Sequence, residues 1–310
     1  MNVKTLVSAF AVAAMMSYGS TTAKAQTPRP EYPRPQFERS EWVNLNGTWT
    51  YSFDFGRTGR DKGWQNNASF EGKITVPFCP ESSLSGVKYT DFINTIWYQR
   101  KIDIPAAWNG KKILLNFGAV DYEAHIFIDG KLVRRHFGTG SSFSCDITKF
   151  VKAGQQHNLV VLVNDNLRDH KQLGGKQSFG FYSAGCNYTR VTGIWQTVWM
   201  EAVAEEGLKS VFATPDIDQK QLVIYPQFYQ ESNTNKLVVT LYDGKKSVAS
   251  KTVNCTNNSV VVLPVKNMKL WSPESPFLYD ITYKVVKDGK TIDEVKSYAG
   301  MRKVHVANGY

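Results

Sequence analysis

Residues 174–201 join a polar, glycine-rich stretch to an aromatic one, and proteins often build binding surfaces from these residue types. The first half is rich in glycine and polar side chains, which predicts a loop. In residues 194–201 the side chains alternate with the period of a strand. A long loop that leads into a rigid strand commonly presents a ligand. The alternative for Trp195 and Trp199 is that both indoles belong to the core of a sheet.

Metal and redox chemistry are not indicated by the acidic residues or the cysteines. Asp165, Asp169 and His170 lie close together, but they offer too few oxygen ligands for calcium and are incomplete for zinc. The cysteines are widely spread and form no CxxC pair: Cys79, Cys145, Cys186 and Cys255. A disulfide would be possible in an oxidising compartment, although the sequence does not specify its pairing. We expect no metal site and no cofactor.

The first 25 residues have the features of an export signal. Lys4 precedes an apolar run at residues 6–16 and the small-residue cleavage site Ala23-Lys24-Ala25. The apolar run is shorter than the ~20 residues needed to span a bilayer. Its removal takes away Lys4 and Lys24, so the net charge falls from +10 to +8. We expect a periplasmic or secreted protein that is not bound to a membrane. Because its basic residues are scattered, we expect no nucleic-acid partner.

The rest of the chain is expected to be all-β. Residues 26–39 contain four prolines and are predicted to form an extended tether. Short strand candidates then recur up to residue 201 without a helical period, which predicts a jelly-roll β-sandwich. The candidates include residues 48–55, 73–76, 96–104, 111–117, 123–128 and 159–163. The last consists of apolar residues only, which predicts a central strand covered on both faces.

A second β domain is predicted after a break at residues 202–207. Its strand candidates lie at residues 208–214, 221–229, 236–242, 247–253, 259–263, 279–287 and 291–297. This number and spacing are typical of an immunoglobulin-like β-sandwich. Cys255 is the only cysteine in this half of the chain, so the internal disulfide of antibody domains is excluded.

Short motifs follow one another in a fixed order along residues 40–305. They are Leu45-Asn46-Gly47-Thr48-Trp49; Thr75-Val76-Pro77 with Glu81, Ser82 and Leu84; Trp97-Tyr98-Gln99-Arg100; Phe117-Gly118-Ala119-Val120-Asp121 through Ile128-Asp129-Gly130-Lys131; Gly175-Lys176-Gln177; Gly193-Ile194-Trp195-Gln196; and Trp271-Ser272-Pro273. In this order they resemble the N-terminal part of glycoside hydrolase family 2, which includes β-galactosidases, β-glucuronidases and β-mannosidases.

The resemblance implies a sugar-binding jelly roll, an immunoglobulin-like domain and a catalytic TIM barrel. Together with the strand pattern it gives a scheme for the chain: signal peptide 1–25, tether 26–39, jelly roll 40–203, immunoglobulin-like domain 204–303, and a truncated linker at 304–310 that leads toward a missing barrel.

Catalysis in this family is implied to rest on two barrel glutamates about 5 Å apart, one acid and one nucleophile. The acid follows an asparagine, whereas none of the 12 glutamates of this chain does. A barrel needs about 250 residues, far more than follow residue 305. We therefore assign no catalytic residue.

The resemblance also implies that loops of the jelly roll reach the substrate. Asp165 matches a position where an aspartate contacts sugar hydroxyls. Asn94 lies near a similar position, although its spacing from Tyr98 departs from the family pattern. The alternative is a structural role, since such residues commonly stabilise turns. Further candidates to meet the sugar or the barrel lie in the polar loop and next to it: Lys176, Gln177, Tyr182, Tyr188 and Trp195.

Three functional hypotheses follow. The preferred one is the non-catalytic part of a family 2 hydrolase whose barrel is absent from this chain or separately encoded. The others are a free-standing secreted carbohydrate-binding module, and a β-sandwich interaction protein without glycan affinity. The expected partners are a β-linked oligosaccharide or glycoside and a TIM-barrel domain. The final segment, with Val304, Val306 and Tyr310, also predicts self-association when no barrel covers it.

Overall fold

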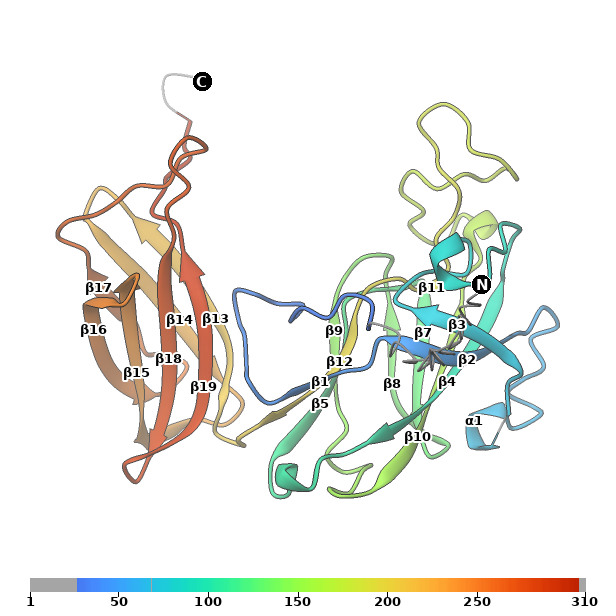
Figure 1. Ribbon diagram of the computed structural model, residues 1–310, viewed down its shortest axis with the longest axis horizontal. Helices are drawn as coiled ribbons and strands as arrows, with labels where there is room; N and C mark the ends of the chain where they lie inside the picture. Colours follow the sequence, from blue (N-terminus) through green and yellow to red (C-terminus); the bar gives the residue numbers. More distant parts are fainter. Residues whose placement is uncertain (1–26, 68, 307–310) are drawn as a thin grey trace, which may run out of the picture.

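The computed structural model describes residues 27–67 and 69–306, which form two β-sandwiches side by side (Figure 1). The predicted export signal and Tyr310 lie outside these residues. The helical elements in the described ranges are short: α1 (Trp64–Asn67) and the 3-10 turns η1 (Ser83–Ser85), η2 (Ala106–Trp108) and η3 (Leu167–Asp169). The predicted all-β fold, a jelly roll followed by an immunoglobulin-like sandwich, is confirmed. None of the described helices is long and apolar enough to cross a bilayer.

The first sandwich packs a six-stranded sheet against a four-stranded one. The six-stranded sheet has the order β3 (Gly72–Val76), β2 (Gly47–Phe53), β4 (Thr95–Asp103), β10 (Gln156–Asn164), β7 (Glu123–Ile128) and β8 (Lys131–Phe137). The four-stranded sheet has the order β1 (Trp42–Asn44), β12 (Val198–Val203), β5 (Lys112–Phe117) and β9 (Phe143–Asp146). A short pair joins β11 (Gly193–Ile194) to β6 (Val120–Asp121). All strand pairs in these sheets are antiparallel.

Strand β10 shows why the apolar run at residues 159–163 is buried on both faces. Leu159, Val161 and Val163 point into the main core between the two sheets. Val160 and Leu162 point to the opposite face, where they join a second cluster with Phe70, Trp97 and Phe127. The segment that follows β2, with α1, covers this second cluster. The predicted central position of this strand is confirmed.

The second sandwich contains the seven strands that the sequence predicts. One sheet has the order β13 (Leu208–Asp216), β14 (Gln221–Phe228) and β17 (Val261–Pro264); the other has the order β16 (Lys246–Cys255), β15 (Ser232–Asp243), β18 (Tyr279–Lys287) and β19 (Lys290–Ala299). Alternate residues such as Leu237, Val239 and Leu241 are fully buried between the sheets. All four cysteines are free, and Cys255 is buried in this core.

The proline-rich segment, predicted to be an extended tether, also contacts both sandwiches (Figure 1). Asn44 Nδ2 donates to the Arg29 carbonyl at 2.8 Å in the first sandwich. Glu38 forms a bridge with Lys296 of β19 through two backbone hydrogen bonds of 2.8 and 2.9 Å. Phe37 packs against the second core. Proline removes N–H donors but leaves carbonyl acceptors, so this segment, here named the strap (residues 28–39), still binds on both sides.

Arg39 of the strap connects the two sandwiches through a buried ion network. Its Nη1 lies 3.2 Å from Glu201 Oε2 of β12, and its Nε lies 3.0 Å from Asp293 Oδ1 of β19. Glu201 Oε1 also accepts hydrogen bonds from Tyr32, Arg34 and Trp199 at 2.8, 2.5 and 2.6 Å. Arg39, Glu201 and Asp293 are 3%, 0% and 8% exposed. This set, the junction network, fixes one sandwich against the other.

The predicted continuous strand at residues 194–201 is interrupted. Ile194 pairs with Val120, whereas the strand resumes at Val198 beside β5. Trp199 is buried, but against the strap on the outer face of β12 and not in the core between the sheets, which contains Val198 and Met200. Trp195 is half-buried, and its Nε1 donates to the Thr139 carbonyl at 2.7 Å.

Candidate functional site

A long loop between β10 and β11 projects from one end of the first sandwich, at the upper right of Figure 1. This loop, residues 165–192, contains the short turn η3 but no strand. Its large apolar side chains are unusually exposed: Phe179 46%, Phe181 55%, Tyr182 85% and Tyr188 48%. Exposed aromatic groups that are gathered on one surface mark an interaction site. These side chains are available to a ligand or partner, and the binding role of the loop stays a prediction.

Phe92 ties this loop to the sandwich through cation–π contacts. The Arg168 and Arg190 guanidiniums lie 3.5 and 4.0 Å from the centroid of its ring. The Phe181 ring meets Phe92 edge-on at 5.6 Å. Arg190 also donates to the Gly180 carbonyl at 2.5 Å. Contacts of this kind each stabilise by about 0.5–2 kcal/mol, so together they hold the loop in a defined conformation.

Asp165 joins the two ends of the loop. Its Oδ1 accepts from Gln172 Nε2 at 2.6 Å, and its Oδ2 accepts from Thr192 Oγ1 at 3.0 Å. Its backbone N–H donates to the Asn94 carbonyl at 3.1 Å. Asp165 is 6% exposed, and its hydrogen bonds fit the alternative in which it stabilises a turn and does not contact sugar. Contact with a sugar hydroxyl would require one of these hydrogen bonds to open.

Two further buried carboxyl groups lie at the base of the loop. Asp121 Oδ2 accepts from Gln177 Nε2 at 2.8 Å, and Glu81 Oε2 accepts from the Thr192 N–H at 3.2 Å. Their other oxygens, Asp121 Oδ1 and Glu81 Oε1, have no hydrogen-bond partner. Asp121 is 1% and Glu81 7% exposed. Such groups are costly to bury as anions.

The pKa values of this carboxyl cluster (Glu81, Asp121 and Asp165) are shifted accordingly. Burial raises the pKa of Glu81 to about 7. Burial, followed by repulsion from Asp165, raises the pKa of Asp121 to about 8. Burial also raises the pKa of Asp165, although hydrogen bonds from Gln172 and Thr192 oppose this. Burial therefore favours the protonated forms of Glu81 and Asp121 beneath the loop.

The cluster predicts that the first sandwich loses stability as the pH rises. The folded-state pKa values of Glu81 and Asp121 exceed their usual values. Their contribution to the free energy of unfolding is therefore complete in acid and is lost as the pH rises through 7–8. Between pH 5 and pH 9 the melting temperature should fall by roughly 3 °C or more. Asp121→Asn should reduce this fall, whereas Asp61→Asn at an exposed position should not. Equal pH dependence in all three proteins would contradict the role of the cluster.

Three of the four predicted sugar-contacting residues come together at the base of the loop. Asn94 and Asp165 share a backbone hydrogen bond, and Gln177 bonds to Asp121. Asn94 Nδ2 donates to the Phe55 carbonyl at 3.2 Å, while its buried Oδ1 has no partner. The fourth, Lys176, is exposed, and its carbonyl accepts from the Tyr188 N–H at 2.9 Å. The loop thus places a polar base beneath exposed aromatic side chains.

Glu81, Asp121 and Arg190 were not among the site residues predicted from the sequence. Glu81 and Asp121 occur within the family-like motifs, but nothing local in the sequence shows that they lie beneath a loop that starts more than forty residues later. Asp169 and His170 lie on the exposed part of the loop. In the described parts of the chain, no group of three or more His, Cys, Asp or Glu side chains is arranged to hold a metal ion.

Two family models match the chain in succession. The model described as "Glycosyl hydrolases family 2, sugar binding domain" matches residues 42–201. The model described as "Glycosyl hydrolases family 2" matches residues 208–302. The first match alone covers half of the chain.

Individual relatives and a solved structure are also similar to this chain. A β-glucuronidase of Bacteroides fragilis is 26% identical over 289 residues, which is 85% of this chain and 38% of that protein. A β-galactosidase of Thermoanaerobacter pseudethanolicus is 24% identical over 225 residues, or 70% of this chain and 29% of that protein. The crystal structure of Ruminococcus gnavus β-glucuronidase matches with a TM-score of 0.70 at 21% identity, over 88% of this chain and 46% of that one. The chain spans less than half the length of these relatives.

Proposed function

Because the chain belongs to glycosyl hydrolase family 2, we propose that it is the sugar-binding and immunoglobulin-like portion of an enzyme that acts on β-glycosides. The observation that carries this proposal is the succession of the two family matches on two sandwiches that the junction network holds together. In this proposal the chain binds the sugar and supports a TIM barrel, and the barrel supplies the residues that hydrolyse the glycoside.

The arrangement of the two sandwiches supports a barrel as the partner. In Figure 1 the described C-terminal end and the 165–192 loop extend toward the same side of the molecule. Val304 and Val306 on the final described segment are 79% and 78% exposed, and apolar side chains this exposed suit a covering partner. A barrel on this side would contact both the loop and the second sandwich. Without a barrel, the same surface favours self-association.

The 165–192 loop is the proposed sugar-contacting element. Tyr182 and Tyr188 offer exposed rings, and Lys176 offers an exposed ammonium group. Asp165 and Gln177 support these groups from below. Relatives named β-glucuronidase and β-galactosidase favour a β-linked hexopyranoside, and the barrel would select which one. We also propose that the protein is exported, because its first 25 residues have the pattern of a signal peptide.

Tyr182→Ala should weaken sugar binding by the isolated chain about fivefold, because loss of an aromatic contact costs roughly 0.5–1.5 kcal/mol. The measurement is a glycan array with residues 26–310, followed by titration of the best β-glycoside. Phe212→Ala removes an aromatic side chain of similar exposure, 69%, from the second sandwich, and it should leave binding unchanged. Binding that is insensitive to Tyr182 would show that the loop is not the site. An array without any bound glycan would favour the interaction-protein hypothesis.

A further inference from the structure

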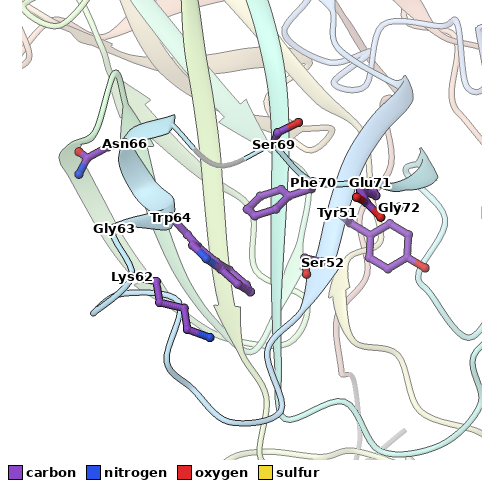
Figure 2. A pocket seen from close by; sticks show the side chains of 10 residues that line it. All are labelled: Tyr51, Ser52, Lys62, Gly63, Trp64, Asn66, Ser69, Phe70, Glu71 and Gly72. Carbon is purple, nitrogen blue, oxygen red and sulfur yellow. The ribbon is translucent and has the colours of Figure 1, made fainter.

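A pocket of about 620 Å³ lies on the first sandwich between α1, strand β2 and the start of β3 (Figure 2). Figure 2 shows Trp64, Phe70 and Tyr51 following one another across it, with Lys62 beside Trp64. In Figure 1, α1 lies at the end of the first sandwich away from the second sandwich, and on the side opposite the 165–192 loop. The pocket is therefore separate from the proposed sugar-contacting loop.

The aromatic side chains of this pocket are fixed by their neighbours. The Trp64 ring meets Phe70 at 5.5 Å and the fully buried Trp97 at 5.8 Å, both edge-on. Gly72 lets Tyr51 lie close to β3, since a Cβ there would be 2.7 Å from the Tyr51 ring. Rigid aromatic side chains bind a ligand with little loss of conformational entropy. The half-buried Trp64 and the buried Phe70 therefore form a preorganised apolar wall on one face of the sheet, while Tyr51 packs toward the main core on the other face.

A second pocket of about 640 Å³ adjoins the first, because Ser69 lines both. Its wall contains Thr48, Thr50 and Gln99, which can both donate and accept hydrogen bonds, and Lys73 and Lys101, which donate them. Gln99 Nε2 donates to Asn158 Oδ1 at 2.9 Å. The two pockets together form a groove, here named the sheet groove, with an aromatic part and a hydroxyl- and amide-rich part. Alternating hydroxyl donors and acceptors are what a chain of sugar rings requires.

The charge of the sheet groove is mostly positive. Lys62, Lys73 and Lys101 line it, against Glu71 as its acidic residue. The salt bridges of the described residues include none of these three lysines. Arg100 also lines the groove, but its Nη1 is occupied by the Leu45 and Asn46 carbonyls at 2.7 and 3.0 Å. Three ammonium groups without a carboxylate partner suit an anionic ligand, and the Lys62 ammonium lies 5.8 Å from the centroid of the Trp64 ring.

We propose that the sheet groove is a second binding site, for an acidic oligosaccharide that contains uronic acid residues. The aromatic wall would take the apolar face of a sugar ring, the threonine and glutamine side chains its hydroxyls, and the lysines its carboxylates. A glycan fits better than a single-stranded nucleic acid, because the groove has only three lysines outside salt bridges, whereas nucleic-acid surfaces are usually lined by larger basic clusters. The site would hold the enzyme on a polymeric substrate and leave the loop free for the chain end.

Isothermal titration of residues 26–310 with hexagalacturonate, and with neutral maltohexaose, tests this proposal. We expect hexagalacturonate to bind, maltohexaose to bind more weakly, and 0.5 M salt to reduce the difference. The double variant with Lys73→Gln and Lys101→Gln, the groove lysine variant, should bind hexagalacturonate roughly threefold to thirtyfold more weakly. This is the effect expected for the loss of two exposed charge contacts. Lys131→Gln with Lys149→Gln, at exposed positions outside the groove, should change binding little.

Other outcomes separate this site from the loop. Tyr182→Ala should leave hexagalacturonate binding in the groove unchanged, so a failure of the loop proposal would not affect it. Trp64→Leu should weaken both hexasaccharides, and its melting temperature shows whether it is folded. The proposal is overturned if hexagalacturonate does not bind, if the groove lysine variant binds as the wild type does, or if a hexanucleotide binds at least as tightly as hexagalacturonate.

Discussion

Purified residues 26–310 should release no nitrophenol from β-glucuronide, β-galactoside or β-mannoside substrates. Retaining glycosidases require two carboxyl groups about 5 Å apart on either side of the scissile bond, and the family resemblance places both on the barrel. The two family matches cover residues 42–201 and 208–302, which form the sandwiches. Binding without these groups stabilises the bound substrate but not the transition state. The expected loss relative to an assembled enzyme is about a millionfold or more.

The strongest objection is that carboxyl groups of the first sandwich could act as a substitute pair. Glu81 and Asp121 have pKa values near those of general acids, about 7 and 8, but they are buried beneath the loop. Glu123 is closer to the end of β10, since its Oε2 accepts from Asn164 at 3.2 Å. Partial burial opposes ionisation of Glu123, but hydrogen bonds from His125, Arg135 and Asn164 hold its pKa at about 2. It therefore remains an anion and cannot donate a proton.

The decisive control for this assay is the variant Asp121→Asn with Glu81→Gln. Nitrophenol release above a buffer blank that disappears in this variant would place an active site in the first sandwich. Release that persists in the variant but disappears after a second purification would indicate a contaminating enzyme, whereas release that survives the purification would contradict the prediction. We expect nitrophenol release by the wild type and by the double variant to equal that of the buffer blank.

Arg39→Ala should lower the free energy of unfolding by about 3–5 kcal/mol, since this is the usual cost of removing one partner from a buried ion pair. The change leaves Glu201 and Asp293, 0% and 8% exposed, without their shared cation. Burial opposes ionisation of Glu201, yet Arg34 and Arg39 hold its pKa below the usual range. The stabilisation by Glu201 is therefore present at neutral pH and is lost only in acid, as the pH falls through the lowered pKa.

Denaturant unfolding followed by tryptophan fluorescence measures this effect, because Trp199 donates to Glu201. Small-angle scattering should show in addition that the two sandwiches of Arg39→Ala are no longer held in one orientation. Lys131→Ala at an exposed position is the matched control and should change stability by less than about 0.5 kcal/mol. An Arg39→Ala protein as stable and as compact as the wild type would mean that the junction network does not join the sandwiches.

The strands could be predicted because their signal is local. Alternation marks β18 (Tyr279–Lys287) at its observed bounds, and an unbroken apolar run marks the interior of β10. The strap could not be predicted, because proline-rich composition does not show that Arg39 will meet Asp293, 254 positions away. The interruption between Ile194 and Val198 has a similar cause. The flanking strands pair with different partners, β6 and β5, while the side-chain alternation continues.

The candidate site was predicted in part for the same reason. The glycine-rich composition identified the loop, and its exposed aromatic side chains agree with a binding surface. The carboxyl cluster depends on three segments that meet only in the folded chain, at Glu81, Asp121 and Asp165. Single-sequence spacing contains no signal for such a meeting.

The central claim is that this chain binds the sugar and supports a TIM barrel, and that the barrel carries out the hydrolysis. The most direct test is to assay nitrophenyl β-glycoside hydrolysis by residues 26–310 alone and by the polypeptide extended with the coding sequence downstream of codon 310. The account predicts that the extension encodes a barrel with a glutamate directly after an asparagine, and that only the extended polypeptide is active. Hydrolysis by residues 26–310 alone would contradict the claim. It would also be contradicted if the extension encoded no barrel and no separate barrel protein restored activity.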